Sequence, residues 1–146
     1  MAGFGSYVPE KVSVIVGGRL ITGFVNGTFI TAERNADAWT TYVGADGLVA
    51  RMYNADHSGI VTLTLMAESP SNAVLSALVA SDEITKAATF NLQIKDLNSL
   101  TTQAAAPFAW IVRPPSLQFG TDQSPREWQI ACSELVIAHG GNSLTV

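Results

Sequence analysis

A strand that runs directly into a capped helix is the feature that most constrains the fold of this 146-residue chain. Apolar residues alternate with threonines along Gly59–Met66, which is the period of a strand with one face on a core. Ser69 can then accept hydrogen bonds from free helix N–H groups, and Pro70 suits a first helical position, where no N–H is needed. The pattern predicts a helix over about 70–80, inserted into a mainly β domain.

The rest of the chain consists of short strand patterns separated by turn dipeptides. Gly17-Gly18 is a tight-turn signal, and Asn26-Gly27 predicts a hairpin between strands at 19–25 and 28–34. Further strands are expected at 11–16, 39–43, 48–54, 88–95, 100–112 and 126–138. We therefore expect one domain over 1–146, a β-sandwich or partly closed barrel of antiparallel strands with the helix covering one opening.

The surface implied by the composition carries little charge. Only 14% of the residues are charged and the net charge is −4, without any run of basic residues. Stable binding to a phosphate backbone needs clustered lysine and arginine, so a DNA-binding role is not expected. Two interpretations remain open, a low-charge soluble domain and a domain whose surface is covered by other copies.

No constellation of residues points to catalysis, a cofactor or a metal ion. His57 and His139 are isolated and are expected to be solvated, and Cys132 lies in an apolar run that favours burial. Two histidines and one cysteine do not make a four-ligand zinc site. Trp110 and Trp128 lie in strand patterns and are expected in the core, so we predict no catalytic, cofactor-binding or metal-binding residues.

The sequence predicts neither a secretory signal nor a membrane-spanning segment. The first six residues lack the basic and apolar regions of a secretory signal, and no apolar run reaches membrane-spanning length. We therefore expect synthesis in a cytoplasm and no membrane-spanning segment.

The order and spacing of several motifs resemble the tail-tube (inner tube) protein family of contractile-tailed bacteriophages. The matching motifs are Tyr7–Val12, Gly23–Ile30, Ala32–Arg34, Val43–Gly47 with Arg51, Ser58–Leu65, Ser69–Leu75, Lys95–Asn98, Ala109–Ile111 and Gly140–Asn142. Ser99 departs from the pattern, because the Asp-Leu-Asn turn is expected to continue with glycine. This departure concerns only the type of turn.

The resemblance implies a structural virion protein of the tail. Its subunits would form hexameric rings that stack into a hollow tube, through which phage DNA is ejected without specific binding. The implied partners are the tail sheath, baseplate and tail-terminator proteins, with the tape-measure protein in the lumen. The residues fit this role independently, since ring closure removes exposed strand edges and a weakly acidic lumen would not retain DNA.

Three segments are candidates for assembly contacts. Residues 35–47 are expected to form an extended loop or hairpin that grips a neighbouring subunit, and residues 1–9 are expected to form an arm that joins on assembly. The candidate interface residues are Trp39, Tyr42, Gly44, Asp46 and Gly47, with Tyr7 and Pro9 in the arm. A polar row at the lumen or a subunit seam is expected from Thr89, Asn91, Gln93 and Lys95.

Two alternatives to a phage tail tube remain at this stage. One is the tube protein of a related contractile injection machine, such as a type VI secretion system or a bacteriocin, which one sequence cannot distinguish from a phage tail. The other is a small ligand-binding β-barrel, which would need a lined cavity with convergent polar groups.

Overall fold

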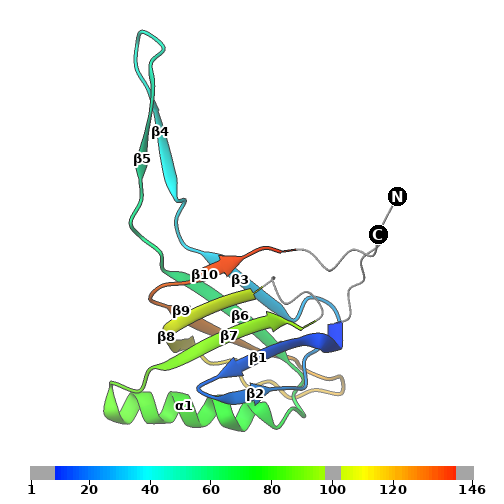
Figure 1. The fold of residues 1–146 in the computed structure, drawn as a ribbon. Coiled ribbons are helices and arrows are strands. Elements are labelled where there is room, and N and C mark those ends of the chain that lie inside the picture. The colour runs from blue at the N-terminus through cyan, green and yellow to red at the C-terminus, as the bar shows by residue number, and fades with distance from the viewer. Residues whose placement is uncertain (1–8, 98–102, 141–146) are drawn as a thin grey trace, which may run out of the picture.

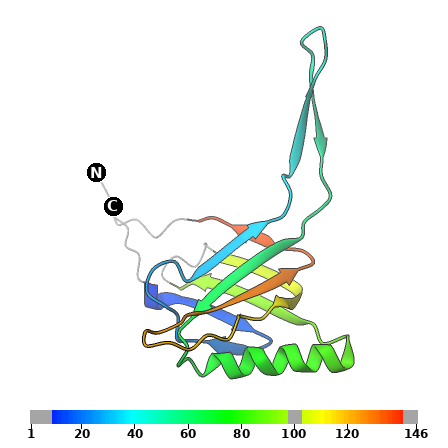
Figure 2. The same cartoon turned by 180° about the vertical axis from the view of Figure 1, so that it is seen from behind.

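A computed structural model describes residues 9–97 and 103–140. In Figures 1 and 2, a curved β-sheet forms the body, one helix lies along one end, and a long hairpin projects from the opposite side. The elements in chain order are a short 3-10 helix Pro9–Lys11, β1 Val12–Val16, β2 Arg19–Ile21, β3 Ile30–Arg34, β4 Trp39–Val43, β5 Val49–Tyr53, β6 Gly59–Leu65, α1 Ser71–Thr85, β7 Phe90–Asp96, β8 Gln103–Arg113, β9 Arg126–Cys132 and β10 Val136–Ala138.

The body is an antiparallel sheet in the order β2-β1-β7-β8-β9-β6-β3, with β10 pairing with the first part of β8. β4 and β5 form a separate two-stranded sheet. This mainly β architecture with one helix confirms the predicted fold class. The Gly17-Gly18 turn between β1 and β2 is also confirmed, and both glycines have positive φ.

The core lies on the concave side of the sheet, because alternate residues of each long strand point inward. In β6 every second residue is buried. In β7 the buried alternate residues are Phe90, Leu92 and Ile94. Trp128 and Cys132 contribute from β9, as predicted. Trp110 is different, because it is half-buried and lies outside the core cluster, so the prediction of a core position for it is wrong.

The segment after β2 nearly closes the sheet into a barrel. Phe24 forms a β-bridge with Leu65, and the N–H of Met66 donates to the carbonyl of Gly23 at 2.8 Å. The predicted hairpin at Asn26-Gly27 is therefore wrong, since β2 pairs with β1 and β3 pairs with β6. Asn26-Gly27 still bends the chain, but it does so along the edge of β6.

The helix is longer than its sequence signals predict. It continues past residue 80 to Thr85, so Asp82 and Glu83 lie inside it rather than in a linker. Asp82 accounts for this end, because its carbonyl accepts from the N–H of Lys86 at 2.6 Å and its carboxylate accepts from the N–H of Ala88 at 3.2 Å. Lys86 adopts a left-handed conformation, which stops the helix.

The start of α1 is tied to the end of β2. Ser69 accepts from the N–H of Ser71 at 3.2 Å and donates to the carbonyl of Thr22 at 2.5 Å. The hydroxyl of Ser71 accepts in turn from the N–H of Thr22 at 2.9 Å. The predicted capping role of Ser69 is confirmed, and the same side chain fixes the helix against the sheet. No helix among residues 9–97 and 103–140 is long and apolar enough to cross a bilayer.

Candidate assembly surface on the projecting hairpin

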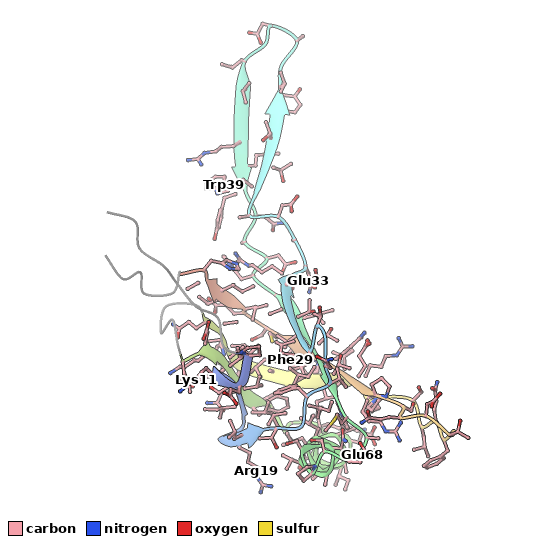
Figure 3. The ribbon with its side chains drawn as sticks, turned by 90° about the vertical axis from the view of Figure 1, so that its right-hand side faces the viewer. Lys11, Arg19, Phe29, Glu33, Trp39 and Glu68 are labelled. Carbon is pink, nitrogen blue, oxygen red and sulfur yellow. The ribbon has the colours of Figure 1, made fainter. Side chains whose placement is uncertain are left out.

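The candidate surface is the hairpin formed by β4 and β5, which pair only with each other among the described residues. It extends well beyond the body in every view (Figures 1 to 3). Its tip is a compact turn, because the N–H of Gly47 donates to the carbonyl of Gly44 at 2.9 Å and the carboxylate of Asp46 accepts from the N–H of Leu48 at 3.2 Å. Gly47 has φ +86°, which favours glycine.

Every residue of both hairpin strands is exposed. The pairing register places Trp39 opposite Tyr53 on one face and Tyr42 opposite Ala50 on the other. The large apolar side chains exposed on this hairpin are Trp39, Tyr42, Val43, Leu48, Val49, Met52 and Tyr53. Both faces of the ribbon therefore present apolar side chains to solvent.

Such a ribbon is unusual for a free surface. An isolated two-stranded hairpin is at best marginally stable in water, and contiguous exposed apolar surface marks a contact site. The predicted segment 35–47 supplies only one strand of it. The turn contributes Leu48, and the returning strand contributes Val49, Met52 and Tyr53. None of these four is among the predicted interface residues. The strand pattern at 48–54 is the signal for these residues, because its pairing with the pattern at 39–43 would form the ribbon.

Contacts within the hairpin hold Trp39 in place. Its ring packs edge-on against Tyr53 with a centroid separation of 5.1 Å, and the guanidinium carbon of Arg51 lies 3.9 Å from its centroid. A cation over an indole face is favourable, by about 0.5–1 kcal/mol at exposed sites. Trp39 is therefore preorganised rather than free to rotate.

The other predicted site residues lie elsewhere. Pro9 is exposed at the start of the 3-10 helix, whereas Tyr7 lies outside the described residues. The polar row lies on the face of β7 opposite the core, with Gln93 half-buried and its other members exposed, namely Thr89, Asn91 and Lys95. The structure does not bring this row together with the hairpin.

His57 differs from the solvated turn residue that its sequence context predicts. It is half-buried between the body and the hairpin, and both of its ring nitrogens have partners. His139 is exposed, as expected. No group of three or more histidine, cysteine or acidic side chains among residues 9–97 and 103–140 is arranged to hold a metal ion.

Comparison with solved structures identifies the fold. The chain is similar to the sheath/tube terminator of an extracellular contractile injection system, PVC, with a TM-score of 0.67 and 15% identity over 92% of this chain and 97% of that one. It is also similar to a chain of the PVC sheath-tube complex, with a TM-score of 0.65 and 16% identity over 90% of each. The fold is that of tube and terminator proteins of contractile systems.

The family itself follows from sequence. Residues 12–140 match the model of the bacteriophage PhiTE tail tube protein family. The chain is also 32% identical over 151 residues to "Structural protein ORF10" of Pseudomonas phage KPP10, covering 97% of this chain and 87% of that protein. The chain therefore belongs to the PhiTE-type phage tail tube family. This is a family of structural proteins rather than enzymes, which confirms both the resemblance and the non-enzymatic prediction.

Proposed function

We propose that this chain is the repeating subunit of the inner tail tube of a contractile phage tail. Copies form hexameric rings, and the rings stack into a hollow tube through which DNA leaves the capsid. The observation that carries the proposal is the hairpin, whose exposed apolar faces need a covering surface, in a chain of the tail tube family. In a repeating tube, a neighbouring copy of the chain would cover these apolar faces.

The hairpin is proposed to be the main contact between neighbouring subunits. Trp39 and Tyr42 lie on opposite faces of it, so a contact that buries both must touch the ribbon from two sides. Gly44, Asp46 and Gly47 keep the tip narrow. The arm at residues 1–9, with Tyr7 and Pro9, is proposed to add to this contact on assembly.

The outer face of β7 is proposed to line the lumen. In the register, Lys95 lies beside Ser13 of β1 and Gln103 of β8, while Gln93 lies beside Ile15 and Ala105. Lys95 is the one charged residue in this set, so the face offers little electrostatic attraction to a phosphate backbone. A location at a subunit seam is the alternative for this row.

The proposed setting is the virion tail, with assembly in the host cytoplasm. The tail sheath would surround the tube, the baseplate and tail terminator would bound it, and the tape-measure protein would occupy its lumen. The similarity to a sheath-tube complex supports a sheath partner. The similarity to chains of the PVC system keeps an injection machine as the second candidate, which genomic context would distinguish.

Electron microscopy of the purified protein over a range of concentrations tests the proposal. Hollow tubes or rings of uniform width are the expected result. Compact particles at every concentration, also in the presence of a matching baseplate as nucleus, would contradict a tube-forming role. Image averaging of the rings would then count the subunits and place β7 relative to the lumen.

A further inference from the structure

The hairpin joins the body through a break in both of its strands. The β3–β6 ladder ends at Arg34 opposite Gly59, and the β4–β5 ladder begins at Trp39 opposite Tyr53. Residues 35–38 and 54–58 connect the two ladders without strand structure. Two backbone hydrogen bonds span these segments, from the N–H of Asn35 to the carbonyl of Ser58 at 3.0 Å and from the N–H of Asn54 to the carbonyl of Ala38 at 2.8 Å. They are fewer than the bonds of a continuous ladder, so side-chain contacts are needed as well to fix the direction of the hairpin.

Side chains bridge this joint. The guanidinium of Arg34, the last residue of β3, contacts Nδ1 of His57. Nε2 of His57 lies 2.6 Å from the hydroxyl of Tyr53 at the end of β5, and Tyr53 packs against Trp39. Figure 3 shows Trp39 at the root of the hairpin, above Glu33 near the end of β3. The chain of contacts therefore runs from the body through His57 into the hairpin.

The partners determine the state of the imidazole. Arginine has only donors, so Nδ1 of His57 must accept from Arg34. The proton of the neutral ring then lies on Nε2, where it is donated to the hydroxyl oxygen of Tyr53. A doubly protonated ring would turn an N–H and a positive charge toward the guanidinium, and this bridge would be lost.

We infer that His57, in its neutral form with the proton on Nε2, is a positioning residue that fixes the direction of the hairpin relative to the barrel. The inference goes beyond the proposed function. It concerns the conformation of the single subunit, so it can be tested on unassembled protein whether or not the chain forms tubes.

The charges around His57 set the direction of the pH effect. Arg34 opposes protonation, and its Nε is buried without a hydrogen-bond partner among the described residues. The carboxylate of Asp56 is held by the N–H and hydroxyl of Ser58, at 3.0 and 2.7 Å. Tyr53 faces the ring from β5, while Asp37 in the segment 35–38 and Glu134 beside Leu135 are exposed.

Acidification should therefore release the hairpin without unfolding residues 54–58. The carbonyl of His57 accepts from the N–H of Leu135 at 2.8 Å, and this backbone bond does not titrate. An ordinary imidazole, with a pKa of about 6.5, is neutral at about pH 8, so the side-chain bridge should be complete there. Because Arg34 opposes protonation, the bridge should be lost only at a pH clearly below that value.

Two measurements on the unassembled protein test the inference. Nitrogen-15 NMR of the two histidines should show the Nε2–H tautomer for His57 at about pH 8, above the ordinary imidazole pKa of about 6.5. Spin labels at A45C on the hairpin tip and A80C on α1 should give one narrow distance distribution at that pH and a broad one at about pH 5. An Nδ1–H tautomer, or a distribution unaffected by pH, would overturn the inference.

Variants separate positioning from folding. His57→Gln keeps an acceptor and a donor but does not titrate, so its distance distribution should lose the pH dependence. His139→Gln removes the chain's other histidine and should behave as the wild type. If His139→Gln abolishes the pH response, or His57→Gln retains it, the inference is wrong. Tube formation is scored separately, so its failure in the wild type would count against the proposed function alone.

Discussion

The indole N–H of Trp128 donates a hydrogen bond of 3.0 Å to the side-chain carbonyl of Asn72. Trp128 is 3% exposed on β9 and Asn72 lies in the first turn of α1, so the bond ties the helix to the sheet it covers. The amide group of Asn72 also donates to the carbonyl of Met66 at 2.9 Å. One asparagine thus connects the sheet, the helix and the loop between them.

Replacing Trp128 by Phe should remove this connection while keeping an aromatic ring in the core. Leaving the asparagine oxygen without a donor should cost about 1–3 kcal/mol of unfolding free energy. Denaturant unfolding of W128F, N72A and the double variant measures the coupling between the two residues. If the two single losses simply add up in the double variant, the hydrogen bond contributes nothing to stability.

Replacing Gly23 by Ala should be more harmful than replacing Gly18 by Ala. Both glycines have positive φ, +79° and +83°, so both substitutions carry similar backbone strain. A Cβ at Gly23 would lie 2.5 Å from Oγ of Ser69, whereas a Cβ at Gly18 has nothing within 4 Å. G23A should therefore lose about 1–3 kcal/mol more than G18A in thermal or denaturant unfolding. Equal losses would show that Ser69 moves aside without cost.

The double variant Trp39→Ala, Tyr42→Ala should prevent polymerisation while leaving the barrel folded. The matched control is Leu117→Ala, Phe119→Ala, because these side chains are 74% and 86% exposed on the loop between β8 and β9. Sedimentation measures polymer mass, and circular dichroism checks the fold. Polymerisation by the hairpin variant at wild-type yield would refute the proposed role of Trp39 and Tyr42.

Cys132 should resist alkylation until the protein unfolds. Burial raises the pKa of its thiol from 9.0 to about 11, so the reactive thiolate is scarce in the native state. Because the folded pKa is the higher one, the unfolded state ionises first as pH rises above about 9, and stability falls from there toward about pH 11. The difference in unfolding free energy between wild type and C132A should show this fall. A pH-independent difference would contradict it.

Asn91→Cys should report the side of the tube that β7 faces. If the row lines the lumen, a bulky thiol reagent should label N91C in free subunits but only slowly in long tubes. Ala77→Cys, on an exposed residue of α1, provides the comparison. Equal and rapid labelling of N91C in tubes and subunits would exclude both the lumen and a closed seam.

Local patterns predicted the faces of the strands well. The alternation in residues 59–65 and 90–95 gives the buried side correctly, because one residue of shift would move a whole apolar set into water. The start of the helix, where Ser69 accepts a hydrogen bond from the N–H of Ser71, was equally predictable. The end of the helix was not, because the hydrogen bond from the N–H of Ala88 to the carboxylate of Asp82 becomes visible only in three dimensions.

The misreadings involve long-range partners. Asn26-Gly27 is a strong local turn signal, but the competing pairing of Phe24 with Leu65 carries the chain onto the opposite end of the sheet. His57 looked solvated because its partners Arg34 and Tyr53 are brought together by the hairpin root. The strand patterns at 39–43 and 48–54 are each evident in the sequence. The candidate surface arises only from their pairing, which the sequence does not reveal.

The apolar character of the hairpin has a thermal consequence. Burial of such side chains is driven by the entropy of water near room temperature and carries a negative heat-capacity change, so it weakens on cooling. A polymer held together through Trp39, Tyr42 and their neighbours should loosen in the cold and tighten with moderate warming. Tails of this kind would then be best assembled warm, and a chilled preparation would be the natural source of intact single subunits.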